Sequence, residues 1–251
     1  MEDVFDGVTV FILAYNETDT LKEVVDTVCD TCEEDDVKQI VLAIKNDRCL
    51  SYGYAVKMLE DEKYGKVRIY LQRSADLISC FPELPPLTVG SHFIIMASDV
   101  EMDPHSVPVM IKKARQNPKA IICASKWMKG SVVEGYGFFH KLGTASMNFA
   151  ISLLVRRKAS DPVSVFEIFP VSLYNEMHFS GGKDFLFEYN IKPLISGAEY
   201  EEIPTVYRKK PDRRSNFEFT TLCKVAVKFI LTAAKFRFGY TSEKKTDHKK
   251  S

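Results

Sequence analysis

Three carboxylates directly follow a short apolar segment in the first half of the chain. Residues 93–97 are mostly apolar, and Asp99, Glu101, Asp103 and Pro104 come next. In an extended segment, alternation places Asp99 and Glu101 on the same side, ~7 Å apart along the chain. Two carboxylates placed in this way repel each other unless a cation lies between them. Oxygen ligands of this kind suit Mg²⁺ or Mn²⁺, which could also bridge to a phosphate.

Asp103 has a simpler structural interpretation than its two neighbours. An aspartate immediately before a proline is typical of a helix N-cap followed by proline at the first helical position. The sequence therefore predicts a helix that opens at Pro104, and it leaves Asp99 and Glu101 as the candidate metal ligands.

The elements that must position these side chains alternate between two patterns. Apolar runs predict strands at residues 8–14, 39–44, 66–72, 91–97 and 118–125. Amphipathic segments predict helices after residue 15, at 51–65, after 104 and at 141–157, the first with a capping box at Thr20 and Glu23. This alternation predicts an α/β fold with a mostly parallel central sheet flanked by helices. Ligands bind such sheets beyond the carboxyl ends of the strands, where "AYNE" (14–17) and "SDVE" (98–101) both fall.

The composition excludes several classes of protein. The chain has 251 residues, with 34 basic and 34 acidic side chains, and this net charge of zero argues against general nucleic-acid binding. Six scattered cysteines and an N-terminus without an export signal predict a cytoplasmic protein with reduced thiols. No apolar run approaches the ~18–20 residues that span a bilayer.

The C-terminal segment differs from the rest, and we expect it to begin after a domain that covers residues 1–220. Residues 208–214 hold five basic side chains, which could form a solvated loop or close on an acceptor phosphate. Residues 222–236 predict an amphipathic helix with an apolar face. Such a helix could pack on the core, or lie at the membrane surface through residues 222–238. The polar, basic tail that completes residues 221–251 is expected to be disordered.

Six segments, in order, resemble the motifs of the family 2 glycosyltransferases, and most of all the branch that contains dolichyl-phosphate mannose synthase. They are "FILAYNE", "MASDVEMDP", "ASKWMKGS", "KLGTASMN", "SDPVSVFEIFP" and "EEIPTVYRKKPDRRSN". The resemblance implies a GT-A fold with a Rossmann-like nucleotide-binding half. It also implies inverting transfer of a sugar from a UDP- or GDP-linked donor, with a divalent metal. The implied acceptor is a polyisoprenyl phosphate at the membrane, or else a growing glycan.

The resemblance also assigns roles to individual residues. Asp99 and Glu101 would hold the metal, and Asp161 would lie near the sugar and the acceptor. Asp161 could serve as a general base for a hydroxyl acceptor, whereas a phosphate acceptor needs cations and no base. The residues that would contact the nucleotide are Ala14, Tyr15, Asn16, Glu17 and Asp47. Those that would contact the diphosphate or the acceptor phosphate are Lys126, Lys141, Lys210 and Arg213.

Three departures from the family pattern affect the donor side. Ala97 replaces the first aspartate of the Asp-X-Asp motif, and Glu101 replaces a glutamine, which restores one negative charge. Of the family's "DDGSxD" segment, Asp47 is the remaining candidate, and the glycine-rich segment that should follow is absent. A catalytically degenerate protein of the same fold, which binds nucleotide sugars or docks at membranes as a scaffold, therefore stays open as an alternative.

Overall fold

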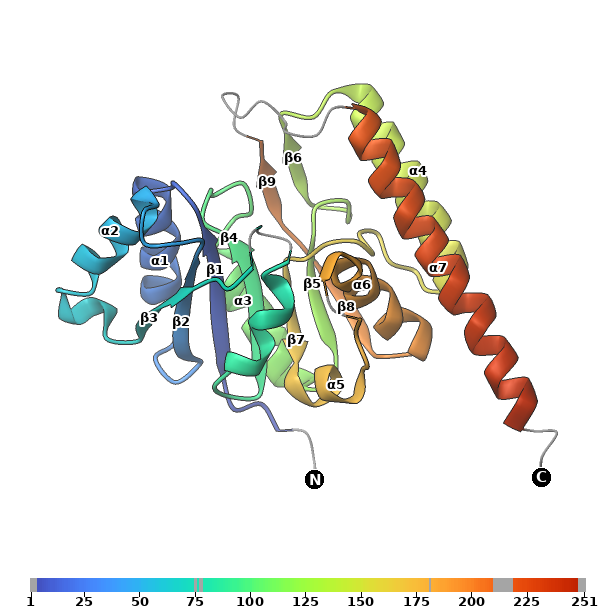
Figure 1. Ribbon diagram of the computed structural model, residues 1–251, viewed down its shortest axis with the longest axis horizontal. Helices are drawn as coiled ribbons and strands as arrows, with labels where there is room; N and C mark the ends of the chain where they lie inside the picture. Colours follow the sequence, from blue (N-terminus) through green and yellow to red (C-terminus); the bar gives the residue numbers. More distant parts are fainter. Residues whose placement is uncertain (1–3, 75, 77–78, 181, 210–218, 248–251) are drawn as a thin grey trace.

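The computed structural model describes residues 4–74, 76, 79–180, 182–209 and 219–247. In these residues a seven-stranded sheet has the order β3-β2-β1-β4-β7-β5-β8, and helices cover both of its faces (Figure 1). Its strands are β1 (Val8–Ala14), β2 (Val37–Ile44), β3 (Val67–Leu71), β4 (His92–Ala97), β5 (Ile121–Ser125), β7 (Glu167–Pro170) and β8 (Tyr200–Pro204). The helices are α1 (Asp19–Thr31), α2 (Leu50–Met58), α3 (Ser106–Gln116), α4 (Phe138–Val155), α5 (Val171–Glu176), α6 (Phe185–Ser196) and α7 (Phe219–Asp247). Short 3₁₀ helices lie at Glu62–Tyr64, Phe81–Glu83, Pro85–Leu87 and Gly182–Asp184.

The core consists of two apolar layers, one on each face of the sheet. All seven residues of β1 are buried because the strand lies between β2 and β4, with helices on both sides. Val10 and Ile12 belong to the layer formed with α1, α2 and α3. Phe11 and Leu13 point the other way and belong to the layer formed with α6. The predicted α/β class with a mostly parallel sheet is confirmed.

β7 is the strand that breaks the parallel pattern. It pairs antiparallel with both of its neighbours, β4 and β5. In a parallel sheet, the residues that follow a strand lie at the ligand edge. Because β7 runs in reverse, the residues that precede it lie at that same edge. This reversal brings Asp161, six positions before β7, level with residues that follow β4 and β5.

A small second sheet stands against this edge. It pairs β6 (Val132–Glu134) in parallel with β9 (Val206–Arg208). An antiparallel bridge joins Met102 to Tyr207, so the segment after β4 is tied to β9. Figure 1 shows this pair of strands at the top of the view, above the end of the large sheet.

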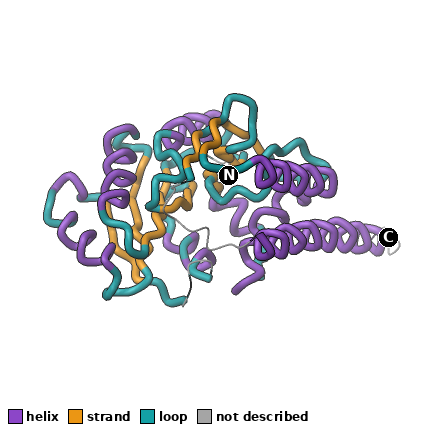
Figure 2. Tube along the Cα trace, turned by 90° about the horizontal axis from the view of Figure 1, so that it is seen from above, coloured by secondary structure: helices purple, strands orange, loops and turns teal. Residues whose placement is uncertain are grey.

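Helix α7 packs on α4 and α6 at one end of the molecule (Figures 1 and 2). Phe229 and Ala233 are buried in a cluster with Ile151, Phe187 and other apolar residues of the two helices. Of the two alternatives left open for this segment, packing on the core is therefore observed for the buried face of α7. The disorder expected for the tail is wrong up to Asp247, where α7 ends. No helix in the described part of the chain is both long enough and apolar enough to span a membrane.

Several predicted helix boundaries are wrong by a few residues. α1 begins at Asp19 with Thr18 at the N-cap position, and no side chain caps it, so the capping box at Thr20 is absent. α3 begins at Ser106, two residues after Pro104. Oδ1 of Asp103 accepts a hydrogen bond from the backbone N–H of His105 at 3.1 Å. Asp103 thus stabilises the turn before the helix, although it is not the N-cap residue.

Candidate active site

The predicted nucleotide-binding residues lie at one edge of the sheet. β1 pairs in register with β2 and β4, matching Ala14 with Ile44 and Leu13 with Ala97. The segments after these three strands therefore emerge side by side. They carry the residues predicted to bind the nucleotide and the metal, namely Tyr15, Asn16, Glu17, Asp47, Asp99 and Glu101. The structure thus brings these residues to a common edge.

The segment after β1 is held by its own side chains. Oε2 of Glu17 accepts hydrogen bonds from the backbone N–H groups of Tyr15 at 2.7 Å and Asn16 at 3.1 Å. The hydroxyl of Ser51 donates to the backbone carbonyl of Glu17 at 2.5 Å, which ties this segment to α2. Nζ of Lys45 lies 4.8 Å from the centre of the Tyr15 ring, and that ring is exposed. Tyr15 therefore offers an exposed aromatic ring beside a cation, a suitable surface for stacking a base.

The carboxylate segment after β4 is a tight turn. Val100 has a φ of 54°, in the left-handed region that a β-branched residue rarely adopts. Oδ1 of Asp99, a side chain that is 7% exposed, accepts from the backbone N–H of Glu101 at 3.1 Å. The extended arrangement predicted for Asp99 and Glu101 is therefore wrong. Strain of this kind persists where the surroundings hold it in place, and it is concentrated at functional sites.

Glu101 is also held by a residue that sequence reasoning missed. The hydroxyl of Tyr207, on β9, donates to Oε2 of Glu101 at 2.7 Å. Burial, together with Tyr136 and Glu101, raises the pKa of Tyr207, so this hydroxyl keeps its proton. The available signal was the position of Tyr207 immediately before the basic run, inside a segment that matches a family motif.

The residues of this turn fit a divalent ion that is shared with a substrate. Within the described residues, no group of three or more histidine, cysteine, aspartate or glutamate side chains could enclose a metal ion. Asp99 and Glu101 supply hard oxygen ligands, but too few for a site made of protein alone. Mg²⁺ and Mn²⁺ are commonly held by one or two carboxylates, with water and substrate phosphates completing the shell. Such an ion would therefore be bound together with a diphosphate.

Of the residues predicted to lie near the sugar or the phosphates, the structure brings Lys126 and Asp161 together. Lys126 follows β5, and its Nζ lies 3.3 Å from Oδ2 of Asp161, whose side chain is completely buried. Burial opposes the charge on Lys126, but the Asp161 carboxylate outweighs it, and the pKa of Lys126 is raised. Nζ also lies 5.6 Å from the centre of the Tyr207 ring. Lys126 is thus kept as a cation between a carboxylate and an aromatic face.

Aromatic rings form a stack beside Lys126. The ring of Tyr136 lies 5.3 Å from Tyr207, 6.2 Å from Trp127 and 4.0 Å from His140, and each pair is nearly parallel. Such rings give this side of the site a rigid wall. The indole N–H of Trp127 has no hydrogen-bond partner in the described part of the protein.

The other predicted phosphate-binding residues are less well defined. Nζ of Lys141 donates to the backbone carbonyl of Val133 on β6 at 3.2 Å, in an exposed position. Lys210 and Arg213 lie outside the described residues.

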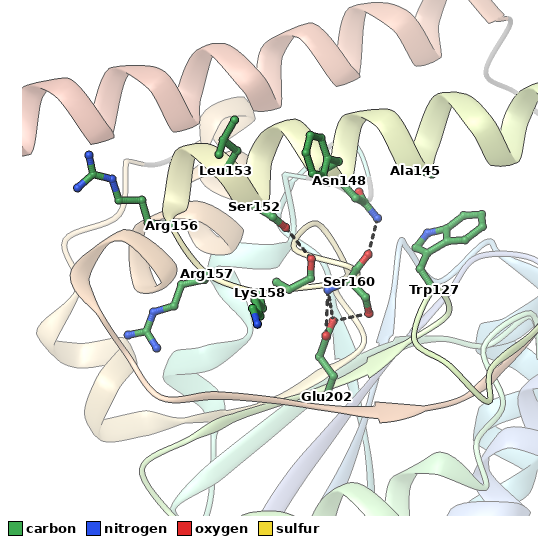
Figure 3. Close-up of a pocket in the computed structure, with 12 residues that line it drawn as sticks. Trp127, Ala145, Asn148, Ser152, Leu153, Arg156, Arg157, Lys158, Ser160 and Glu202 are labelled. Carbon is green, nitrogen blue, oxygen red and sulfur yellow. Dashed lines mark hydrogen bonds between the residues drawn. The ribbon is translucent and has the colours of Figure 1, made fainter.

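A cavity of about 750 Å³ opens at Ser160, which precedes Asp161 in the chain, between α4 and the strands (Figure 3). Its α4 wall includes Phe149 and Leu153, and Trp127 and Asn148 lie at one end. Figure 3 shows Arg156 and Arg157 pointing outward at the other end. The floor is polar, because Glu202 accepts hydrogen bonds from the backbone N–H groups of Ser160 and Asp161, both at 2.9 Å. These bonds fix the segment that carries Asp161.

At one edge of the sheet, the geometry combines a carboxylate turn after β4 with a paired lysine and buried aspartate near the end of β5. The sequence model of glycosyl transferase family 2 matches residues 9–177. The chain therefore belongs to glycosyl transferase family 2, which confirms the predicted family and the enzyme class that it defines.

Known proteins agree with this assignment. A dolichol-phosphate mannosyltransferase from Pyrococcus furiosus is 29% identical over 168 residues, which are 63% of this chain and 45% of that protein. The chain thus matches less than half of that relative. Glucosyl-3-phosphoglycerate synthase from Mycobacterium tuberculosis, solved with UDP, has a TM-score of 0.66 at 14% identity, over 93% of this chain and 80% of that one. Mannosyl-3-phosphoglycerate synthase from Rubrobacter xylanophilus has a TM-score of 0.64 at 12% identity, over 91% and 73%. These neighbours confirm the predicted GT-A fold.

Proposed function

We propose that the chain transfers a sugar from a UDP- or GDP-linked donor to a polyisoprenyl phosphate, with inversion at the anomeric carbon. In this reaction an oxygen of the acceptor phosphate attacks the anomeric carbon. The bond from that carbon to the diphosphate breaks, and the nucleoside diphosphate leaves. Inversion follows because a single displacement occurs from the face opposite the leaving group.

The donor would lie along the segments that follow β1, β2 and β4. The exposed ring of Tyr15 would stack on the base, and Asn16 and Asp47 would contact the ribose or the base. Asp99 and Glu101 would hold Mg²⁺ or Mn²⁺, which supplies positive charge to the departing diphosphate when bound. One solved neighbour, the glucosyl-3-phosphoglycerate synthase from Mycobacterium tuberculosis, was determined with Mn²⁺, UDP and glucosyl-3-phosphoglycerate, and it has a TM-score of 0.58 with this chain at 12% identity. The missing first aspartate is compatible with this arrangement because Glu101 brings a second carboxylate to the turn.

The environment of Asp161 is the observation that carries the choice of acceptor. A general base must touch the proton that it removes. The Asp161 side chain is completely buried, and its carboxylate contacts the ammonium group of Lys126. It is better placed to keep Lys126 charged and oriented than to deprotonate a hydroxyl. A phosphate acceptor, already an anion, needs a cation of this kind and no base.

The surroundings of Lys126 support the same acceptor. Lys141 and the segment with Lys210 and Arg213 would add positive charge. The apolar wall of the neighbouring cavity, with Phe149 and Leu153, suits the first isoprene units of a lipid.

Exposed apolar side chains on α4 and α7 support contact with a membrane. Those on α4 are Phe138, Leu142, Phe149 and Leu153, and those on α7 are Val227, Leu231 and Phe238. The two helices lie side by side (Figures 1 and 2). Lys224 and Lys235 are exposed on the same α7 helix and would attract anionic lipids. Residues 222–238, together with α4, would therefore place the acceptor phosphate beside Lys126.

The test is transfer of labelled sugar from UDP- and GDP-linked donors to a short polyisoprenyl phosphate in the presence of Mn²⁺. A labelled lipid whose anomeric configuration is opposite to that of the donor supports the proposal. Transfer to a glycan hydroxyl, with none to the lipid phosphate, refutes the assigned acceptor. Binding of nucleotide sugars in a thermal-shift screen without any transfer, or binding to vesicles without any nucleotide-sugar affinity, favours the degenerate alternative.

A further inference from the structure

We infer that Tyr207 is a positioning residue, whose hydroxyl sets the Glu101 carboxylate for the cation and whose ring sets Lys126 for the acceptor phosphate. This inference rests on the function proposed above, because it takes Glu101 as a metal ligand and Lys126 as a phosphate-binding residue. Tyr207 lies between these two residues. Tyr207 is not placed in contact with the reacting atoms, so it would act through Glu101 and Lys126.

The backbone around Tyr207 is fixed from two sides. On one side, Tyr207 pairs with Val133 in the small sheet. On the other side, it forms the bridge to Met102, and the backbone N–H of Arg208 donates to the carbonyl of Glu101 at 3.0 Å. The position of the tyrosine relative to the carboxylate turn is therefore set by the main chain, before any side-chain contact is considered.

The side chain of Tyr207 uses two different groups for its two contacts. Its hydroxyl donates to Oε2 of Glu101 at 2.7 Å. A hydrogen bond to a charged carboxylate is among the stronger ones in proteins, and it restricts the rotation of the glutamate. The centre of the ring instead lies 5.6 Å from Nζ of Lys126, and the ring also stacks on the ring of Tyr136. Because the groups differ, substitutions can separate the two roles.

Positioning matters at this turn because few protein ligands hold the ion. A carboxylate that samples several rotamers must be ordered when the cation binds, which weakens binding. Residues that orient the ligands of a metal typically change metal affinity by ~10–100-fold when they are replaced. The hydroxyl of Tyr207 is such an orienting group for Glu101.

The experiment compares Tyr207→Phe, which loses only the hydroxyl, with Tyr207→Leu, which also loses the aromatic face. Mn²⁺ affinity is measured on the full chain from the electron paramagnetic resonance signal of free Mn²⁺, alone and with UDP or GDP. Tyr207→Phe should weaken Mn²⁺ binding by ~10-fold and leave the KM for polyisoprenyl phosphate unchanged. Tyr207→Leu should weaken Mn²⁺ binding and also raise the acceptor KM.

Tyr70→Phe is the matched control. The hydroxyl of Tyr70 donates to Oε2 of Glu83 at 2.8 Å, so this variant loses a tyrosine–glutamate hydrogen bond of nearly the same length, on β3. Its Mn²⁺ affinity should equal that of the unaltered chain. Tyr207→Phe keeps the ring in the stack, and an unchanged melting temperature would show that it folds normally.

The outcomes separate this inference from the proposed function. If the unaltered chain binds Mn²⁺ and Tyr207→Phe binds it equally well or more tightly, the inference is wrong while the proposed function stands. If the unaltered chain binds no Mn²⁺ and transfers sugar in the presence of a chelator, the metal assignment and the inference are both wrong.

Discussion

Nζ of Lys126 lies 3.3 Å from Oδ2 of Asp161, and the side chain of the aspartate is completely buried. The two residues are 35 positions apart, and they meet because the antiparallel β7 brings the segment before it to the edge where Lys126 leaves β5. The carboxylate keeps a largely enclosed ammonium group charged. The pair therefore gives the site a permanent cation, at the cost of burying two ions.

Replacing Asp161 with asparagine should change how the reaction depends on pH. The carboxylate raises the pKa of Lys126, whereas burial alone would lower it. In Asp161→Asn the lysine should therefore lose its proton at a lower pH than in the unaltered chain. The alkaline limb of the kcat/KM profile for the acceptor should shift to lower pH by the same cause. The measurement is the pH profile of kcat/KM. An alkaline limb that does not move would contradict the role assigned to Asp161.

The same variant should also lose stability. Breaking a buried ion pair leaves one charge uncompensated and typically costs about 3–5 kcal/mol. Glu134→Gln is a suitable control because it breaks the exposed pair with Arg208, which has the same separation of 3.3 Å. An exposed pair contributes only about 0–1 kcal/mol. Chemical denaturation of both variants would measure the difference.

Asp99→Asn should abolish the effect of Mn²⁺ on nucleotide binding. A neutral amide is a weaker ligand for a hard cation than a carboxylate, and the substitution removes one negative charge from the turn. We expect isothermal titration with UDP and GDP to show Mn²⁺-dependent binding in the unaltered chain. In the variant, the nucleotide affinity measured with Mn²⁺ should fall by about tenfold or more. Asp103→Asn serves as the control, because Asp103 lies in the same segment but is bonded to His105. Equal losses in both variants would argue against a metal site at Asp99.

Glu167→Gln should make the protein more stable at alkaline pH than the unaltered chain. Glu167 is buried on β7 opposite Cys123, and burial raises its pKa from 4.5 to about 8. The folded state therefore holds a proton that the unfolded state releases, so this group costs stability as the pH rises from 4.5 to about 8. Glutamine stays neutral at every pH in this range, so Glu167→Gln should not show this loss of stability.

Melting temperatures at pH 5 and pH 8.5 would test this prediction. For a chain of this size, ~1 kcal/mol corresponds to about 2–4 °C. The gain in Glu167→Gln should be larger at pH 8.5 than at pH 5. Glu176→Gln, at an exposed position on α5, provides the control. An equal change at both pH values would contradict the raised pKa.

Leu153→Glu and Leu231→Glu should weaken binding to vesicles that contain anionic lipids. These leucines are 69% and 63% exposed, on α4 and α7, so replacing them should leave the melting temperature nearly unchanged. Burying a leucine in an apolar phase contributes about 1.5 kcal/mol or more, so each change should reduce partitioning by about tenfold. Val109→Glu, at an exposed position of α3, should bind vesicles as the unaltered chain does. Flotation on a density gradient measures all three.

The parts of the fold that depend on local patterns could be predicted from the sequence. The apolar runs at residues 8–14 and 93–97 became buried strands because both faces of the sheet are covered. The face of Leu21, Val24, Val25 and Val28 became the buried side of α1. Helix ends were less predictable, because α1 starts without a side-chain cap that the sequence could announce.

From the strand pattern alone, the position of a site residue could be predicted only where the residue directly follows a strand. Asp99 and Lys126 are of this kind, and strand order alone places them at one edge. The contact between Glu101 and Tyr207 joins residues 106 positions apart and depends on a small second sheet that no periodicity announced. The position of Asp161 depends on a strand that runs in reverse, which a continuous apolar run does not reveal. The left-handed turn at Val100 was equally hidden, because valine rarely adopts it.

The order of the strands sets a spacing between the two halves of the site. β7 separates β4 from β5, so the acidic turn and Lys126 leave strands that are two steps apart. Two steps of ~4.8 Å give roughly 10 Å, measured across the strands. Tyr207 stands in this interval, with its hydroxyl on Glu101 and the centre of its ring 5.6 Å from Nζ of Lys126. The order of the strands therefore fixes how far the acidic turn stands from Lys126 and Asp161.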